Sequence, residues 1–246
     1  MAKLTQQELD AQVVASEEFQ KTQMANKLNW LRAGVLGAND GIMSTSGIVM
    51  GIAGSPNATS AQIILAGVAA LVAGSISMAG GEYTSVSAQR DSEIAALAKE
   101  SQELKDNPEA ELRELTFFYE QKGLSFELAQ KVATELTAKD ALRAHAEAEL
   151  GIDSEEQVSP TSAAMSSFVA FAGGSILPLL AISMAPSVRI WLTLAAVVLS
   201  LTVTGYVGAK IGGAKAGRAI VRNLLVSLAT MGITYGIGHL VGSNVA

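Results

Sequence analysis

The sequence lacks cysteine and is poor in charged residues. The absence of cysteine excludes disulfides, thiolate metal sites and cysteine nucleophiles. Charged side chains make up 16% of the 246 residues and hydrophobic ones 49%, whereas soluble domains contain roughly 25% charged residues. Together with a mean hydropathy of +0.33, this composition indicates a membrane protein.

Acidic residues are also scarce, except in one part of the chain. Between Glu82 and Glu156 the sequence contains 18 Asp and Glu against 8 Lys and Arg, a balance of −10. The remaining residues include 5 acidic and 9 basic side chains, a balance of +4, and the two balances add to the net charge of −6. The chain therefore combines a basic-edged membrane part with an acidic insert, and no nucleic-acid partner is expected.

Five apolar stretches are long enough to cross a lipid bilayer as helices. They cover residues 33–53, 63–81, 161–185, 190–209 and 223 to the C-terminus. Helices satisfy their own backbone polar groups in lipid, which open strands cannot do. The predicted fold is an all-α membrane protein with five transmembrane helices and a three-helix insert between the second and third. The predicted divisions are an N-terminal segment over 1–32, two spans over 33–81, the insert over 82–157 and three spans over 158–246.

Lys and Arg lie mainly on one side of this predicted bundle. They precede the first span, follow the second and join the fourth to the fifth, whereas Arg189 alone lies on the opposite side. Because basic loops are retained in the cytoplasm, the N-terminus and the insert are expected there. The first 32 residues resemble an amphipathic segment rather than a signal peptide, which favours a prokaryotic plasma membrane over a vacuolar membrane.

Asp40 lies near the middle of the first apolar stretch, with no basic residue beside it. A charge at that depth costs at least ~2.5 kcal/mol, so it needs a partner or a water-filled cavity. Met43 lies close to it, and Met78 and Glu82 are one helical turn apart at the end of the second span. A carboxylate with a thioether favours first-row transition ions over Mg²⁺ or Ca²⁺, so we predict a metal pathway.

Glycine and proline in the spans each leave two interpretations open. Gly37-x-x-x-Gly41 and Gly47-x-x-x-Gly51 allow close helix approach, either within one subunit or at a dimer contact. Pro178 in the third span is expected to loosen that helix and free carbonyls beside a cavity, or only to kink it.

The acidic insert is predicted to form three helices, which end near Asn107, near Gly123 and at Gly151. Each carries ligand side chains at one-turn spacing, namely Glu100 with Glu103, Glu111 with Glu114, and His145 with Glu149. Residues three or four apart share a helix face, so three such helices could enclose divalent metal ions. The alternative is a solvated acidic face that pairs with neighbouring Lys and Arg.

Several motifs resemble the vacuolar iron transporter family over about residues 29–242. They are LRAGVLGANDGIMSTSGIVMGIAG, AGSISMAGGEYTSVSAQRDSE, FAGGSILPLL and RNLLVSLATMGITYGIGHLVG. The resemblance implies a homodimer of five-helix subunits with a cytoplasmic metal-binding domain, which exports Fe²⁺ and often Mn²⁺ from the cytosol in exchange for protons. It places Asp40, Met78 and Glu82 in the membrane pathway and assigns the insert glutamates to metal capture. Where the family has methionines before the last glutamate, this chain has His145-Ala146.

Two other functions are weighed against transport. A membrane-tethered di-iron oxidase would use Glu-x-x-His pairs from two helices, whereas the insert contains one histidine, in the order His145-x-x-x-Glu149. A metal-binding protein that transports no ion would have no use for Asp40, whose charge costs free energy in the bilayer. We therefore expect a transporter rather than an enzyme, with no tightly bound cofactor, and leave the choice among Fe²⁺, Mn²⁺, Co²⁺ and Zn²⁺ open.

Overall fold

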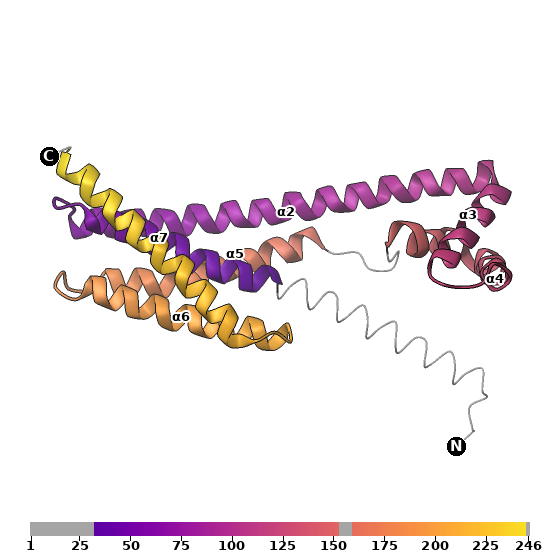
Figure 1. Ribbon diagram of the computed structural model, residues 1–246. Coiled ribbons are helices and arrows are strands. Elements are labelled where there is room, and N and C mark those ends of the chain that lie inside the picture. Colours follow the sequence, from indigo (N-terminus) through magenta and orange to yellow (C-terminus); the bar gives the residue numbers. More distant parts are fainter. Residues whose placement is uncertain (1–31, 153–158, 245–246) are drawn as a thin grey trace, which may run out of the picture. The chain divides into compact units, whose positions relative to one another are not determined.

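The computed structural model describes residues 32–152 and 159–244, and all regular elements in these ranges are helices (Figure 1). They are a first helix over residues 32–54, α2 Ser60–Asp106, α3 Pro108–Gln121, α4 Phe126–His145, the π-helix η1 Ala146–Leu150, α5 Pro160–Ile182, α6 Arg189–Ile211 and α7 Ala216–Asn244. The predicted all-α fold is confirmed for these residues. The predicted N-terminal segment, apart from Arg32, lies outside them.

The described helices form two compact units. The membrane unit comprises residues 32–84 and 159–244, and the polar unit comprises residues 85–152. Helix α2 contributes its first part to the membrane unit and its last part to the polar unit. The expected continuation of the second span into the acidic insert as one helix is confirmed.

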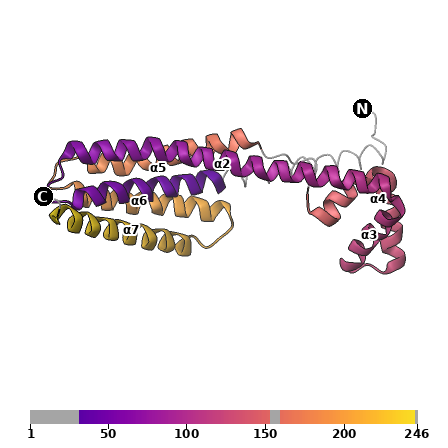
Figure 2. The ribbon, with the colours of Figure 1, turned by 90° about the horizontal axis from the view of Figure 1, so that it is seen from above.

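Four helices in the described ranges are long and apolar enough to cross a membrane, namely α2, α5, α6 and α7. In the membrane unit they lie beside the first helix (Figure 2). The first predicted span falls within residues 32–54 of the first helix, which is not one of these four, so the count of five spans stays a prediction. Helix α7 begins at Ala216 rather than after Arg222, because its first turns include basic residues that a search for apolar runs excludes.

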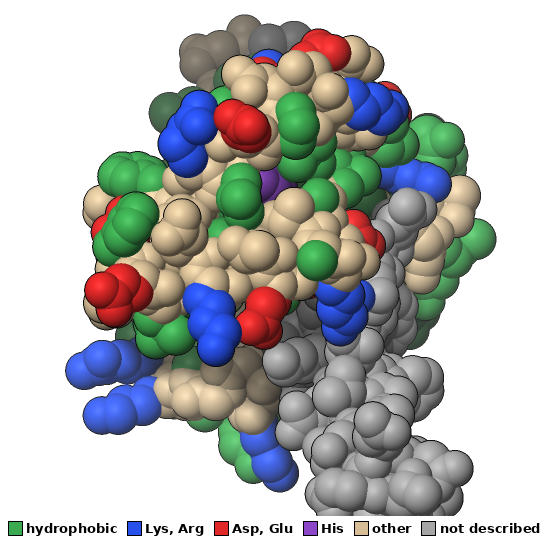
Figure 3. Space-filling view, turned by 90° about the vertical axis from the view of Figure 1, so that its right-hand side faces the viewer, with side chains coloured by type: hydrophobic (Ala, Val, Ile, Leu, Met, Phe, Trp, Pro, Cys, Tyr) green, Lys and Arg blue, Asp and Glu red, His purple; other side chains and the backbone are tan. Residues whose placement is uncertain are grey.

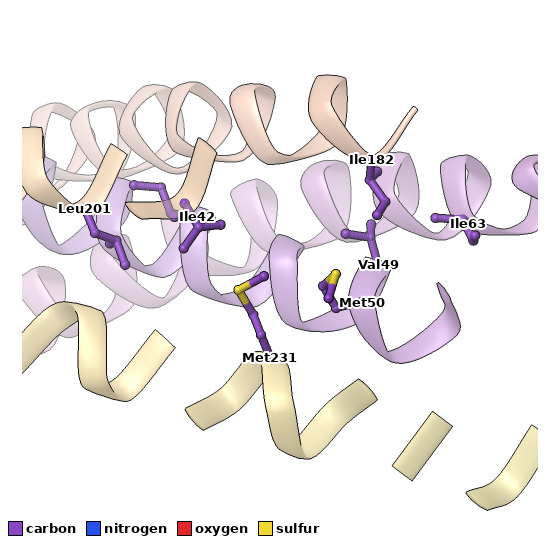
Figure 4. Packing of buried hydrophobic residues seen from close by; sticks show 8 residues of the cluster. Ile42, Val49, Met50, Ile63, Ile182, Leu201 and Met231 are labelled. Carbon is purple, nitrogen blue, oxygen red and sulfur yellow. The ribbon is translucent and has the colours of Figure 1, made fainter. Parts of the chain in front are cut away.

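The core of the membrane unit is apolar and draws on all five helices (Figure 4). Its buried members are Ile42, Val49, Met50, Ile63, Ile182, Val197, Leu201 and Met231. Large apolar side chains also point outward, with Leu65 71% and Trp191 72% exposed. Water would oppose such exposure, whereas hydrocarbon does not, so the outer surface suits a lipid environment.

The glycines of the first helix are used for contacts within this chain. A Cβ on Gly41 would collide with the carbonyl oxygen of Phe171 in α5, and one on Gly54 would collide with that of Tyr235 in α7. Gly238 of α7 in turn lies against the backbone of Gly51. Close packing within one subunit therefore accounts for both glycine motifs, and the predicted dimer contact stays a prediction.

Helix α5 continues past Pro178 to Ile182, and Pro178 itself is buried. Proline removes one backbone donor from a helix, so the carbonyl four residues earlier loses its usual partner. That carbonyl belongs to Gly174, where a Cβ would collide with the backbone of Ala38 in the first helix. Gly174 therefore packs against the first helix, α5 is not interrupted, and the freed carbonyl beside a cavity stays a prediction.

The polar unit is built mainly on the packing of α3 against α4. Asn107 caps α3 by accepting a hydrogen bond from the Ala110 N–H, and Pro108 is the first helical residue, as the sequence predicts. The core of the unit consists of Leu115, Ala133 and Ala144, with Leu112, Tyr119, Leu136 and Ala148 packed around them. Figure 3 shows acidic and basic side chains interspersed on the exposed surface of this unit.

The prediction of one uninterrupted third helix up to Gly151 is wrong. The backbone at Asp140 is extended, with φ −163° and ψ 96°, which breaks α4 into two parts. The Asp140 carboxylate accepts a hydrogen bond from the Arg143 N–H at 3.0 Å, as a residue that caps a new helix does. The chain then widens into η1 and ends at Gly151, whose φ of +63° suits glycine.

Candidate metal centre and membrane residues

Three of the predicted ligands meet in the interior of the polar unit. Glu100 comes from α2, Glu111 from α3 and His145 from the end of α4, and their ligand atoms all lie within 4.8 Å of one another. The three residues are 3%, 9% and 0% exposed. Acidic side chains are rarely buried unless they are paired or bound to a metal, so this cluster calls for a compensating charge.

Four donor atoms converge at the centre of the cluster. Nδ1 of His145 lies 2.9 Å from Oε1 of Glu100, 3.8 Å from Oε2 of Glu111 and 3.6 Å from Oε2 of Glu149. Although the first distance is short, its geometry is not that of a hydrogen bond. Oε1 of Glu100, both ring nitrogens of His145 and Oε2 of Glu149 are buried without a hydrogen-bond partner. Buried polar atoms nearly always have a partner, so Oε1 of Glu100, Nδ1 of His145 and Oε2 of Glu149 form a candidate cation site.

The electrostatics of the cluster favour added positive charge. Burial, followed by the charge of Glu149, raises the pKa of Glu100 above its ordinary value. Burial, followed by the charge of Glu114, raises the pKa of Glu111. Two mechanisms thus oppose ionisation of these carboxylates, namely loss of water and repulsion between like charges. A dication bound here would remove the repulsion and compensate for the lost hydration.

The other two predicted ligands lie outside this centre. Glu103 forms an exposed ion pair with Lys99 at 2.8 Å, one turn along α2, and this contact raises the pKa of Lys99. Glu114 is exposed on α3 and acts on Glu111 only through its charge. Of the six predicted ligands, the structure brings together Glu100, Glu111, His145 and Glu149.

The predicted membrane residues are all partly buried within the membrane unit. Oδ1 of Asp40 accepts a hydrogen bond from the Ser44 hydroxyl at 2.7 Å, while Met43 packs against the apolar core. Met78 lies on α2, and Glu82 approaches the Arg32 guanidinium at 3.5 Å with 15% of its side chain exposed. Their assembly into one pathway stays a prediction.

Three polar residues make contacts that the sequence did not predict. Asn39 accepts a hydrogen bond at 2.6 Å from the Thr204 hydroxyl, which joins the first helix to α6. Thr45 donates to the Ser175 hydroxyl at 2.8 Å, which joins the first helix to α5. Asp140 caps the segment that carries His145 and Glu149. Asn39 lies in the NDG motif and could have been singled out, whereas no signal in the sequence marks Asp140.

The fold and the buried centre define a class of protein: a helical integral membrane protein with a polar unit that carries a carboxylate–imidazole cluster suited to divalent metals. Comparison with known proteins agrees. The model of the VIT family matches residues 31–239, and the chain belongs to this family. It is 42% identical over 215 residues to a protein named vacuolar iron transporter from Acanthamoeba castellanii, covering 86% of this chain and 78% of that protein.

Plant proteins are also similar. Over 222 residues the chain is 36% identical to vacuolar iron transporter homolog 4 of Arabidopsis thaliana, covering 89% of this chain and 88% of the relative. It is 32% identical over 219 residues to homolog 5 of Oryza sativa subsp. japonica, covering 88% and 83%.

Proposed function

We propose that this protein transports Fe²⁺, and also Mn²⁺, out of the cytosol across a membrane in exchange for protons. The observation that carries the proposal is the buried set of unpartnered donor atoms on Glu100, His145 and Glu149. Family membership and the partly buried carboxylate of Asp40 in an apolar helix support movement of the ion rather than storage.

The donor set supports the choice of ion. Carboxylate oxygens alone suit Mg²⁺ and Ca²⁺, whereas an added imidazole nitrogen suits first-row transition ions. In the proposed sequence the polar unit collects the ion from the cytosol, and Glu82, Met78 and Asp40 carry it through the membrane unit. Protons compete for the same carboxylates, because a protonated carboxylate is a poor ligand. Acidity on the far side would therefore release the metal.

The proposal includes an orientation and an assembly. Arg32 of the first helix and the basic residues around the end of α6 and the beginning of α7 support a cytosolic location for those ends and for the polar unit. The proposed membrane is a prokaryotic plasma membrane, and the proposed assembly is a homodimer.

Metal uptake into proteoliposomes tests this function. Asp40→Asn keeps the size of the side chain and removes its charge, so uptake of Mn²⁺ is expected to fall at least about tenfold, as for loss of a metal ligand. The matched control is Asp91→Asn, which makes the same change at an exposed position of α2. Undiminished uptake by the Asp40 variant would remove this residue from the pathway.

A dye trapped in the vesicles tests proton exchange. Addition of Mn²⁺ outside acidic vesicles is expected to raise the internal pH in step with uptake. Stoichiometric metal binding without flux would instead favour the alternative of a non-transporting metal-binding protein.

A further inference from the structure

The membrane unit contains a cavity between the first helix, α6 and α7. It has a volume of about 430 Å³, and its lining includes Arg32, Asn39, Thr204, Arg222 and Asn223. It lies between Arg32 in the first helix, the end of α6 and the beginning of α7, so it is expected near one surface of the membrane. The volume is within the range of small-molecule sites, roughly 300–1,000 Å³.

The lining of the cavity combines cationic and apolar groups. Arg32 and Arg222 supply two guanidinium groups, whereas Val35, Leu36 and Ala209 supply apolar walls. Gly208 packs closely against the first helix, since a Cβ there would come within 3.1 Å of the Val35 side chain. A ligand that matches this lining carries an anionic group and an adjoining hydrocarbon chain.

The surrounding charge reinforces the match. The chain has no Asp or Glu after Glu156. Lys210 lies in the last turn of α6, Lys215 precedes α7 and Arg218 lies in the first turn of α7. Among the described residues Arg222 makes no ion pair or side-chain hydrogen bond. A planar guanidinium binds phosphate oxygens in a two-pronged manner, and basic cavities between membrane helices bind anionic lipid headgroups.

We propose that this cavity binds an anionic phospholipid of the adjacent leaflet. Arg222 and Arg32 bind the phosphate and headgroup, and the walls of Val35 and Leu36 contact the beginning of an acyl chain. The proposal does not depend on what the protein transports.

Lipid binding at this site would also act on Glu82. The Arg32 guanidinium that lines the cavity lies 3.5 Å from Oε1 of Glu82. A phosphate that draws Arg32 into the cavity therefore weakens this ion pair and leaves the Glu82 carboxylate available for another cation. If the proposed pathway is correct, that carboxylate is one of its members, and the lipid would favour metal entry.

Native mass spectrometry of the full-length protein tests the site with phosphatidylglycerol and phosphatidylcholine as probes. The wild-type protein is expected to retain phosphatidylglycerol in preference to phosphatidylcholine. Arg222→Gln is expected to weaken this retention about fivefold, the contribution of one basic residue near an anionic surface, and Arg222→Lys is expected to preserve most of it. Arg218→Gln is the matched control, because Arg218 lies one turn earlier on α7 and outside the lining.

Three results would overturn the proposal. Equal retention of both lipids would show that charge plays no part. An equal loss in the Arg218 and Arg222 variants would show a diffuse surface effect in place of a site. No phosphatidylglycerol on the wild-type protein would show that the cavity is not a site for this lipid. Each result is a measurement of lipid binding alone. Failure of the transport proposal would therefore leave the lipid proposal unaffected.

Discussion

At the scale of single residues, the metal centre depends on which ligands face the interior. Glu111 lies one turn before the buried Leu115 and is itself buried, whereas Glu114 is exposed. Two residues three positions apart differ by about 60° around a helix axis. The spacing could therefore predict that each pair shares a face, but not which member points inward. The position of Glu111 relative to Leu115 was the available signal.

Glu100→Gln should change metal binding and stability in opposite directions. The variant loses a charged ligand, so affinity for Mn²⁺ or Co²⁺ is expected to fall about 10- to 100-fold. The pKa of Glu100 is raised in the folded protein, which means that its charged form is disfavoured there at neutral pH. Removing that charge should stabilise the metal-free polar unit by on the order of 1 kcal/mol. Calorimetric titration and thermal unfolding measure the two effects.

Glu103→Gln is the control for this prediction, because Glu103 lies on the same helix in an exposed pair with Lys99. It should leave metal affinity nearly unchanged and alter stability by less than about 1 kcal/mol. If both variants lost metal affinity equally, the binding site would be the acidic surface and not the buried centre.

At the scale of the elements, helix packing in the membrane unit depends on backbone contact at glycine. Gly41→Ala should destabilise the protein, since the added Cβ would collide with the Phe171 carbonyl oxygen and force α5 away from the first helix. Gly232→Ala, on α7, has open space within 4 Å and should be neutral or slightly stabilising. Thermal unfolding in detergent compares them, and equal melting temperatures would show that this close packing contributes little.

The break in α4 is a second feature of this scale, and it positions two ligands. Asp140→Ala removes the cap of the segment that carries His145 and Glu149, at a cost of about 1 kcal/mol. Metal affinity is expected to fall severalfold although no ligand is changed, because the segment is less well ordered. Asp140→Asn keeps a side-chain oxygen that can accept from the Arg143 N–H, and it should bind metal nearly as the wild-type protein does. Equal affinity in both variants would argue against a positioning role.

Helix ends were predictable where the sequence has a proline or glycine that stops a helix. Asn107-Pro108 and Gly151 mark helix ends that the structure shows within a residue. The break at Asp140 was not predicted, because no glycine or proline lies beside this residue to mark a helix end. The widened turn of η1 likewise has no signature in AEAEL.

At the scale of the whole molecule, composition separates a polar unit from a membrane unit. The acidic stretch between Glu82 and Glu156 overlaps the polar unit over residues 85–152. Charge counts predict such a division because acidic residues are costly in lipid. The pairing of the first helix with α5 and α7 could not be predicted, since glycine motifs specify close approach without specifying the partner helix.

Metal should stabilise the polar unit alone if the buried centre is the site of binding. A free metal concentration 100 times the Kd stabilises the folded form by about 2.7 kcal/mol, which slows exchange of amides that open with the unit about 100-fold. Hydrogen exchange of the full-length protein with Mn²⁺ should show this protection in peptides that contain Glu100, Glu111 and His145, and not in α6. The Glu100→Gln variant should lose most of it. Equal protection in α6 would instead indicate that metal closes the whole molecule, because a ligand bound to one unit stabilises a second only where the two unfold together.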